Sequence, residues 1–194
     1  PAESVKASSF GFSEKDATAC FQKAIDSGVK KLIVDNTGRE WLVGPIRLRS
    51  GQEIVFADGV VVRALPGAFK KQGESLFTAK DVSGVTLRGG KNAVLMMNKK
   101  DYQDTARYQW SEWRHLLSLR GASDVVISGL TLKASGGDGI YVSTGSGQRG
   151  CRDVLIDNVT CDDHHRQGIS IISAENLLVR NSRFRNTCGT PPQC

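Results

Sequence analysis

The sequence lacks the features that mark membrane-spanning and nucleic-acid-binding proteins. None of its apolar stretches approaches the ~20 residues that a membrane-spanning helix needs. Lysine and arginine outnumber the acidic residues by 26 to 20, for a formal charge of +6, but no five of them are consecutive. We therefore expect no membrane span and no nucleic-acid partner. The positive balance either favours an anionic partner, such as an acidic polysaccharide, or only keeps the protein soluble.

Cysteine is also scarce, and its spacing does not match that of a metal site. The five cysteines are Cys20, Cys151, Cys161, Cys188 and Cys194. Cys188 and Cys194 are close enough in sequence for a disulfide, which the sequence neither requires nor excludes. The chain begins at Pro1 without Met and shows no signal peptide, as expected of a processed or trimmed chain.

One helix is predicted, over residues 13–28. Ser13 can cap its N-terminus, with Asp16 at the capping-box position, and Gly28 suits its C-terminus. An apolar stripe at helical spacing runs through Ala17, Cys20, Phe21, Ala24 and Ile25. Because the rest of the chain is rich in strands, we expect this stripe to cover the open end of a stack of sheets and to bury the Cys20 thiol.

Short β-rich runs separated by Gly, Asn, Asp and Ser follow the predicted helix. They are Lys31–Val34, Trp41–Val43, Ile46–Leu48, Glu53–Phe56, Val60–Arg63 and Val85–Leu87. Many short strands between regular turns are typical of a barrel, a sandwich or a β-solenoid.

Three later segments repeat one another, which favours the solenoid. Their central apolar runs, at a period of roughly 23 to 29 residues, are Val125–Ile127, Val154–Ile156 and Leu177–Val179. A two-residue corner ending in Gly129, Asn158 or Asn181 follows each run. Gly and Asn tolerate the left-handed backbone that such a corner needs. We therefore predict coils stacked about 4.8 Å apart, with these three residues in a ladder along one edge.

We expect residues 1–194 to form a single all-β domain. Residues 13–28 cap its first coil, residues 91–114 form an inserted loop, and residues 115–188 hold the clearest coils. A solenoid needs a cap at both ends. Because the sequence stops at Cys194 after a complete coil, we expect it to be a fragment of a longer chain.

Motifs along the whole chain resemble those of pectate-lyase-like and polygalacturonase-like proteins. They are Phe10-Gly11-Phe12, Ala24-Ile25-Asp26, Gly44–Gly51, Ser135–Val142 and Asp162–Ile171. The resemblance points to a bacterial branch of that superfamily. It implies a right-handed parallel β-helix, a secreted or periplasmic location, and a polysaccharide or oligosaccharide substrate.

Two features limit what the resemblance implies about the reaction. The third repeat lacks the Gly-His-Gly motif of polygalacturonases. In the branch that the chain resembles, sequences like Asn186–Gln193 usually lead into a coil with two acidic residues, which would lie beyond Cys194.

The aligned coils bring ionisable residues together on one wall. Asp138 falls over Gln167, and the run Asp162–Arg166 comes just before Gln167. Glycoside hydrolysis needs two carboxyl groups, one to protonate the leaving oxygen and one to act as base or nucleophile. We predict Asp138 for one of these roles. For the other role, the candidates are Asp163 and the acidic pair expected beyond Cys194. The alternative is that Asp138 and Asp163 only shape turns.

Other residues near this run have predicted roles as well. His165 can shuttle a proton near neutral pH, and Arg166 can clamp a uronate carboxylate. Five further residues are predicted to contact the substrate: Arg114, Tyr141, His164, Gln167 and Trp113. The last belongs to an aromatic-rich stretch whose rings either stack on sugars or cover the flank of the solenoid.

The expected function is hydrolysis of glycosidic bonds in an acidic polysaccharide. One alternative is a polysaccharide lyase or uronate epimerase with a His or Arg base, and another is a carbohydrate-binding solenoid without catalysis. No cofactor is predicted, although Asp162 and Asp163 could hold Ca²⁺ together with backbone carbonyls. The glycan, its linkage and the oligomeric state stay open.

Overall fold

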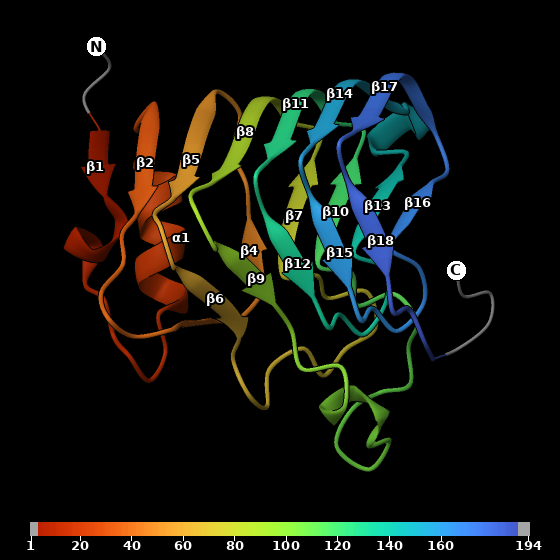
Figure 1. The fold of residues 1–194 in the computed structure, drawn as a ribbon, viewed down its shortest axis with the longest axis horizontal. Coiled ribbons are helices and arrows are strands. Elements are labelled where there is room, and N and C mark those ends of the chain that lie inside the picture. Colours follow the sequence, from red (N-terminus) through yellow and green to blue (C-terminus); the bar gives the residue numbers. More distant parts are fainter. Residues whose placement is uncertain (1–3, 190–194) are drawn as a thin grey trace.

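The computed structural model describes residues 4–189, which wind into the stacked coils of a parallel β-solenoid (Figure 1). Each complete coil contributes one strand to each of three sheets. The first sheet, in pairing order, holds β1 (Ser4–Lys6), β2 (Lys31–Val34), β5 (Gln52–Phe56), β8 (Ser83–Gly89), β11 (Ser123–Ser128), β14 (Cys151–Asp157) and β17 (Ala174–Arg180).

The other two sheets follow the same order of coils. The second sheet holds β4 (Ile46–Arg47), β7 (Phe77–Lys80), β10 (Leu117–Arg120), β13 (Ile140–Ser143) and β16 (Ile169–Ile171). The third sheet holds β3 (Trp41–Val43), β6 (Val61–Ala64), β9 (Val94–Met96), β12 (Thr131–Lys133), β15 (Thr160–Asp162) and β18 (Arg183–Arg185). Three short 3-10 helices are η1 (Ala7–Phe10), η2 (Asp101–Gln103) and η3 (Ser146–Gln148).

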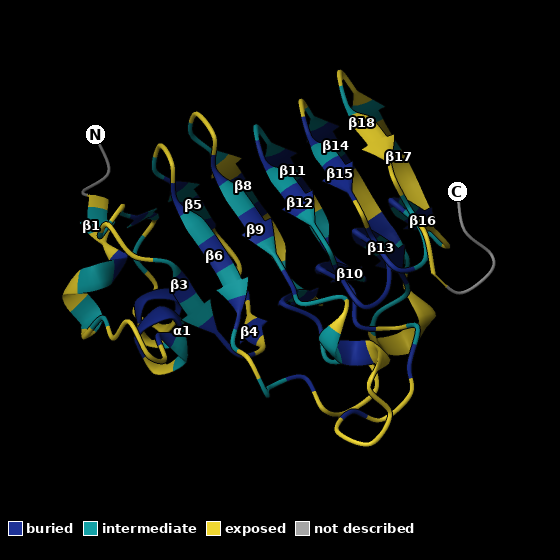
Figure 2. Ribbon diagram, turned by 60° about the horizontal axis from the view of Figure 1, so that its bottom comes forward, coloured by how far each residue is buried: buried dark blue, intermediate teal, exposed yellow. Residues whose placement is uncertain are grey.

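Inward side chains form columns along the solenoid. Leu87, Ile127, Ile156 and Val179 lie in register on four successive strands of the first sheet. The first three are buried, and Val179 in the last coil is half-buried. Figure 2 shows the same gradient, from buried inner coils to an exposed β18. The predicted stacking of the three repeats is therefore confirmed.

The corner residues adopt the backbone conformation that the sequence predicted. Gly129, Asn158 and Asn181 have φ angles of +68°, +54° and +52°. The amide of Asn181 also donates a hydrogen bond to the Asp157 carboxylate at 2.9 Å, which links one corner to the coil below. Left-handed residues at one repeat position thus turn each strand of the first sheet toward the third.

The α-helix of the described residues, α1 (Thr18–Asp26), is shorter than the predicted 13–28. The Asp16 carboxylate accepts a hydrogen bond from the backbone N–H of Thr18 at 2.9 Å, a turn that holds the preceding residues outside the helix. The Phe21 ring lies 5.6 Å from the rings of Trp41 and Phe77, so the helix covers the first coils as expected. Within residues 4–189, no helix is long and apolar enough to cross a bilayer.

The insertion is shorter than predicted at its start. Val94–Met96 forms the regular strand β9, which pairs with β6 and β12, so the prediction that residues 91–96 lie in the insertion was wrong. The interruption runs over residues 97–116, between β9 and β10, and projects from the lower edge of the solenoid in Figure 1. The alternation of side chains in β9 matches the coils on either side, which explains why it pairs normally.

The described residues test part of the cysteine predictions. Cys20 is buried, and its thiol donates a hydrogen bond to the carbonyl of Ala7 at 3.2 Å. Cys194 lies outside the described residues, so its pairing with Cys188 is not tested.

Candidate active site

Asp138 lies at the end of a turn from the third sheet to the second, directly before β13. Its side chain is fully buried. One carboxylate oxygen accepts a hydrogen bond from the Gln167 backbone N–H at 3.1 Å, and the other lies 3.4 Å from Arg166 Nη1. Burial raises the pKa of Asp138, and this effect outweighs the hydrogen bond from Ser170 and the charge of Arg166. Asp138 therefore keeps its proton to a higher pH than an exposed aspartate.

Glycines on both sides of Asp138 allow other segments to approach it. A Cβ atom at Gly137 would lie 2.6 Å from the carbonyl oxygen of Glu112. One at Gly139 would lie 2.6 Å from His164 Nε2. The glycines thus let the insertion and the next coil close over Asp138.

Two buried histidines lie on either side of Asp138 along the solenoid. Nδ1 of His115 accepts a hydrogen bond from the Asp138 backbone N–H at 3.0 Å, and Nδ1 of His164 accepts one from the Ser135 backbone N–H at 3.3 Å. Burial lowers the pKa of His115 to about 3 and that of His164 to about 4. Both rings are therefore neutral near pH 7. In His115, whose Nδ1 accepts, the ring proton lies on Nε2. Nδ1 of His164 also lies 2.8 Å from the Ser135 hydroxyl oxygen.

Arg166 holds two carboxylates of the protein itself. Its Nη1 lies 3.4 Å from Asp138 Oδ2, and its Nε lies 3.7 Å from Glu112 Oε2. In this structure it is therefore not free to clamp a uronate carboxylate as predicted. Glu112 belongs to the insertion, outside the repeats, and the alignment of coils gave no signal for it.

Asp163 does not join Asp138. It occupies the corner position that Ala134 and Asn186 occupy in neighbouring coils, and all three have left-handed φ angles of +60°, +55° and +56° respectively. Its carboxylate lies 2.8 Å from Lys99 Nζ and is half exposed. The alternative that Asp163 shapes a turn therefore agrees with its geometry better than a catalytic role.

The two carboxylates considered for calcium are both paired with cations. Asp162 accepts hydrogen bonds from Arg185 and Asn186, which lower its pKa although its burial acts in the opposite direction. Asp163 is paired with Lys99. Over residues 4–189, no group of three or more His, Cys, Asp or Glu residues could hold a metal ion. This arrangement does not favour a calcium site.

His165 and Arg114 connect the insertion to the coils. His165 Nδ1 lies 3.1 Å from the Gln103 amide nitrogen, and burial lowers the pKa of this histidine. The fully buried Arg114 donates hydrogen bonds to the carbonyls of Phe69, Lys70 and Gln109. These bonds fix the insertion, and the buried guanidinium is not accessible to a substrate as predicted.

The remaining predicted contacts lie near the outward face of the second sheet. Tyr141 is half-buried, stacks on His115 with ring centroids 4.3 Å apart, and has the Arg120 guanidinium 5.0 Å from its ring. Gln167 accepts a hydrogen bond from the Ser170 hydroxyl. Trp113 is 45% exposed, so its ring is available to a ligand.

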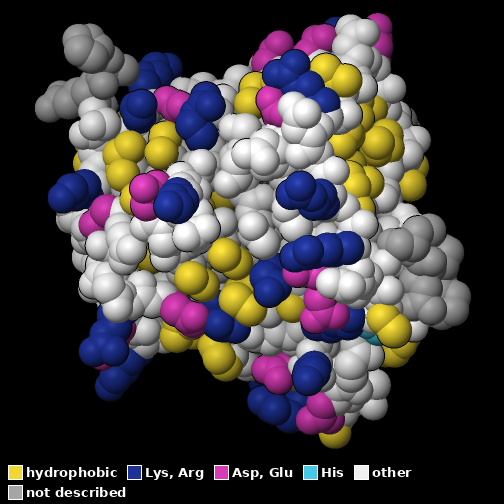
Figure 3. Space-filling model, in the orientation of Figure 1, with side chains coloured by type: hydrophobic (Ala, Val, Ile, Leu, Met, Phe, Trp, Pro, Cys, Tyr) yellow, Lys and Arg dark blue, Asp and Glu magenta, His cyan; other side chains and the backbone are white. Residues whose placement is uncertain are grey.

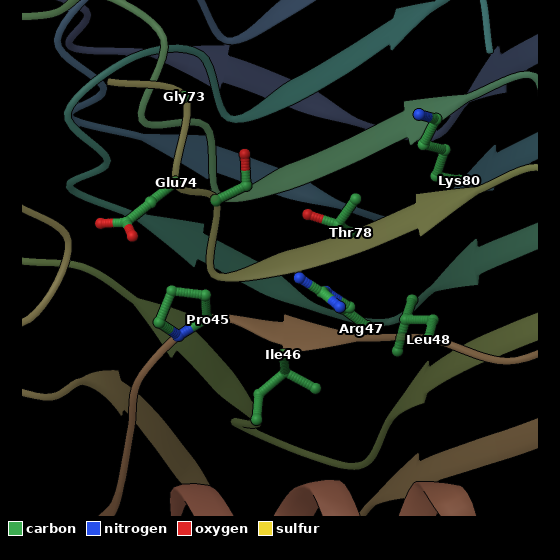
Figure 4. A pocket seen from close by; sticks show the side chains of 9 residues that line it. Pro45, Ile46, Arg47, Leu48, Gly73, Glu74, Thr78 and Lys80 are labelled. Atoms are coloured by element: carbon green, nitrogen blue, oxygen red, sulfur yellow. The ribbon is translucent and has the colours of Figure 1, made fainter. Parts of the chain in front are cut away.

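A hollow of about 530 Å³ opens on the first strands of this face. Arg47 on β4 and Thr78 and Lys80 on β7 line it, and Glu74 comes from the loop before β7 (Figure 4). Within the described part of the chain, neither cation forms an ion pair, and Glu74 accepts a hydrogen bond from the Lys71 backbone N–H.

Comparisons with known proteins agree with this architecture. The family model for the right handed beta helix region matches residues 82–191, more than half of the chain. The chain therefore belongs to the right-handed β-helix family, and its fold is a right-handed parallel β-helix. No curated protein matches the sequence.

Three solved structures share the fold at low sequence identity. A protein from Parabacteroides merdae ATCC 43184, described provisionally as a glycosyl hydrolase, is 18% identical with a TM-score of 0.64, over 97% of this chain and 94% of that one. Iota-carrageenase complexed to iota-carrageenan fragments is 18% identical with a TM-score of 0.75, over 92% and 41%. Polygalacturonase from Erwinia carotovora ssp. carotovora is 13% identical with a TM-score of 0.51, over 92% and 68%. The chain thus spans less than half the length of the carrageenase.

Proposed function

We propose that this chain acts as a secreted or periplasmic glycoside hydrolase on an acidic polysaccharide. The observation that carries the proposal is Asp138, a buried carboxyl group with a raised pKa at the head of β13. The outward face of the same sheet bears unpaired cations and the half-buried ring of Tyr141. The β-helix enzymes that share the fold include a polygalacturonase and an iota-carrageenase bound to carrageenan fragments, which supports a glycan substrate.

Asp138 is suited to donate a proton to the leaving glycosidic oxygen. A general acid works best when its pKa lies near the working pH, and burial moves the pKa of Asp138 in that direction. The carboxyl group is buried, however, and it forms an ion pair with Arg166. The proposal therefore requires the partly exposed Arg166 side chain to move away from Asp138 when a glycan binds.

The distribution of cations supports an acidic substrate. On the first and third sheets, most outward cations are paired, as in Lys31 and Arg88 with Glu53, or Arg63 with Glu40. Lys6, Arg152 and Arg183 on these sheets form no ion pair with a described residue. Figure 3, which views these two sheets from outside, shows basic side chains beside acidic ones.

The second sheet differs from the other two. Lys80 and Arg120 are direct neighbours on β7 and β10, and Arg47 lies on β4. None of the three forms an ion pair with any described residue. Like charges opposite each other on adjacent strands are destabilising. An anionic glycan would supply the missing counter-charge.

The direct test is a reducing-end assay on polyuronates, sulfated galactans and neutral glucans. We expect new reducing ends from an acidic glycan, and a loss of about 10²–10⁴-fold in kcat for Asp138→Asn, the usual contribution of a general acid. The thermal midpoint of the variant should be measured in parallel to show that it folds. Full activity of Asp138→Asn, or cleavage of neutral glucans alone, would disprove the proposal.

The lyase and epimerase alternatives need a base that removes a proton from the sugar. His115 does not suit this role, because its Nδ1 accepts a hydrogen bond from the Asp138 backbone N–H and its proton therefore lies on Nε2. His164 is fully buried, so its ring does not reach a sugar in this structure. Products with ultraviolet absorbance, formed without hydrolysis, would favour a lyase. Tight binding with no product of any kind would favour the non-catalytic solenoid.

A further inference from the structure

We propose that Glu112, carried by the insertion, is the second carboxylate of the reaction. The inference rests on the proposed hydrolase function and replaces Asp163, the partner that the sequence suggested. Glycoside hydrolysis needs two carboxyl groups on either side of the scissile bond. In the described part of the chain, Glu112 is the carboxylate that shares a basic partner, Arg166, with Asp138.

The backbone of the insertion fixes Glu112 beside the Asp138 turn. Its carbonyl oxygen lies 2.6 Å from the position that a Cβ atom of Gly137 would take, so only a glycine before Asp138 permits this approach. Arg114, two residues later, forms an antiparallel bridge with Gly136. The Arg114 side chain also donates hydrogen bonds to three backbone carbonyls. The segment that carries Glu112 is therefore held both by the bridge to Gly136 and by these carbonyls.

The two carboxyl groups have different environments. Asp138 is fully buried, whereas the Glu112 side chain is 20% exposed and beside the guanidinium of Arg166. A base or nucleophile must reach water or the sugar, which Glu112 can do and Asp138 in its present position cannot. Paired groups with contrasting surroundings are typical of an acid and a base that act together.

The reaction balances with these two residues. Asp138 gives its proton to the glycosidic oxygen as the bond from that oxygen to the anomeric carbon breaks. In the inverting form, Glu112 takes a proton from water while the water oxygen bonds to the anomeric carbon. In the retaining form, a Glu112 oxygen bonds to that carbon itself. Water oxygen then bonds to the carbon as its bond to Glu112 breaks, and the deprotonated Asp138 takes a proton from the water.

The test compares Glu112→Gln with Glu175→Gln, a matched change at an exposed residue on β17. With an acidic glycan that the wild type cleaves, we expect Glu112→Gln to lose about 10²–10⁴-fold in kcat and Glu175→Gln to stay within twofold. Added azide should restore turnover to Glu112→Ala, because a small anion can replace a missing base or nucleophile. Unchanged thermal midpoints would show that the variants fold.

The outcomes separate this inference from the proposed function. Wild-type rates in Glu112→Gln, with loss in Asp138→Asn, would overturn the role of Glu112 alone. Loss in Asp163→Asn with full activity in Glu112→Gln would restore the partner suggested by the sequence. No cleavage of any glycan by the wild type would overturn both the function and the role.

Discussion

At the scale of single residues, the site is built from groups whose burial decides their charge. Asp138, His115 and His164 are each less than 2% exposed. Burial disfavours the charged form of each, so it raises the pKa of the aspartate and lowers those of the two histidines. Both histidine rings are therefore neutral near pH 7, and the aspartate keeps its proton to a higher pH than an exposed aspartate does.

The buried histidines predict a specific loss of stability in acid. Their pKa values fall from 6.5 to about 3 and about 4 on folding, so between these values and 6.5 the unfolded chain binds more protons than the folded one. The contribution of the two neutral, buried rings to the free energy of unfolding is complete above pH 6.5. It is lost as the pH falls toward 4. Urea unfolding at pH 7, 6, 5 and 4 should show a free energy of unfolding that decreases by a few kcal/mol.

A variant that lacks one of the two rings tests whether the histidines cause this loss of stability in acid. His164→Gln should reduce the dependence on pH between 6.5 and 4, because one proton-binding group is removed from the unfolded chain. A free energy of unfolding that stays constant from pH 7 to 4 in the wild type would contradict the neutral, buried state of both rings.

At the scale of elements, the cations on the strands of the second sheet form no ion pair with a described residue, whereas most of those on the other two sheets do. Lys80 and Arg120 lie opposite each other on β7 and β10, as Lys31 and Glu53 do on β2 and β5. The first pair repels and the second pair attracts, with a separation of 3.4 Å between Lys31 Nζ and the Glu53 carboxylate.

Charge reversal at these two lysines should therefore have opposite effects on stability. Lys80→Glu should raise the free energy of unfolding by about 0.2–1 kcal/mol, since it creates an attractive pair with Arg120. Lys31→Glu should lower it by a similar amount. Lys80→Glu should also weaken binding of an acidic oligosaccharide in calorimetric titration, while Lys31→Glu leaves it unchanged. Equal binding by both variants would show that the second sheet does not recognise the anion.

The elements that the sequence predicted well are those that repeat. Periodic apolar runs and the corner residues Gly129, Asn158 and Asn181 were sufficient to predict the coils, because stacking makes equivalent positions perform equivalent tasks. The insertion has no counterpart in neighbouring coils, so neither Glu112 nor the true start at residue 97 could be predicted in this way.

Repetition also explains why the structure does not favour the predicted catalytic role of Asp163. Its sequence neighbours are histidines and a second aspartate, which favoured chemistry, but the aligned positions Ala134 and Asn186 show that it is a corner residue. The distance between Asp163 and Asp138 depends on the path of the turn between the third and second sheets. That path depends on contacts with the insertion, which the sequence alone does not define.

At the scale of the whole molecule, the solenoid brings distant parts of the chain to one face. Cations of the second sheet come from β4, β7 and β10, Asp138 precedes β13, and Arg166 belongs to the next coil. The insertion adds Glu112, which lies beside Arg166, and it also carries the exposed Trp113. An extended glycan lying along this sheet would cross several coils and meet all of these groups in order.

The most direct test of this account is a crystal structure of Asp138→Asn with a bound acidic oligosaccharide, since the variant should bind the glycan without cleaving it. The account predicts a glycan along the second sheet, with its anionic groups against Lys80 or Arg120 and one glycosidic linkage between position 138 and Glu112. A glycan bound to the first or third sheet, with the second sheet empty, would contradict it.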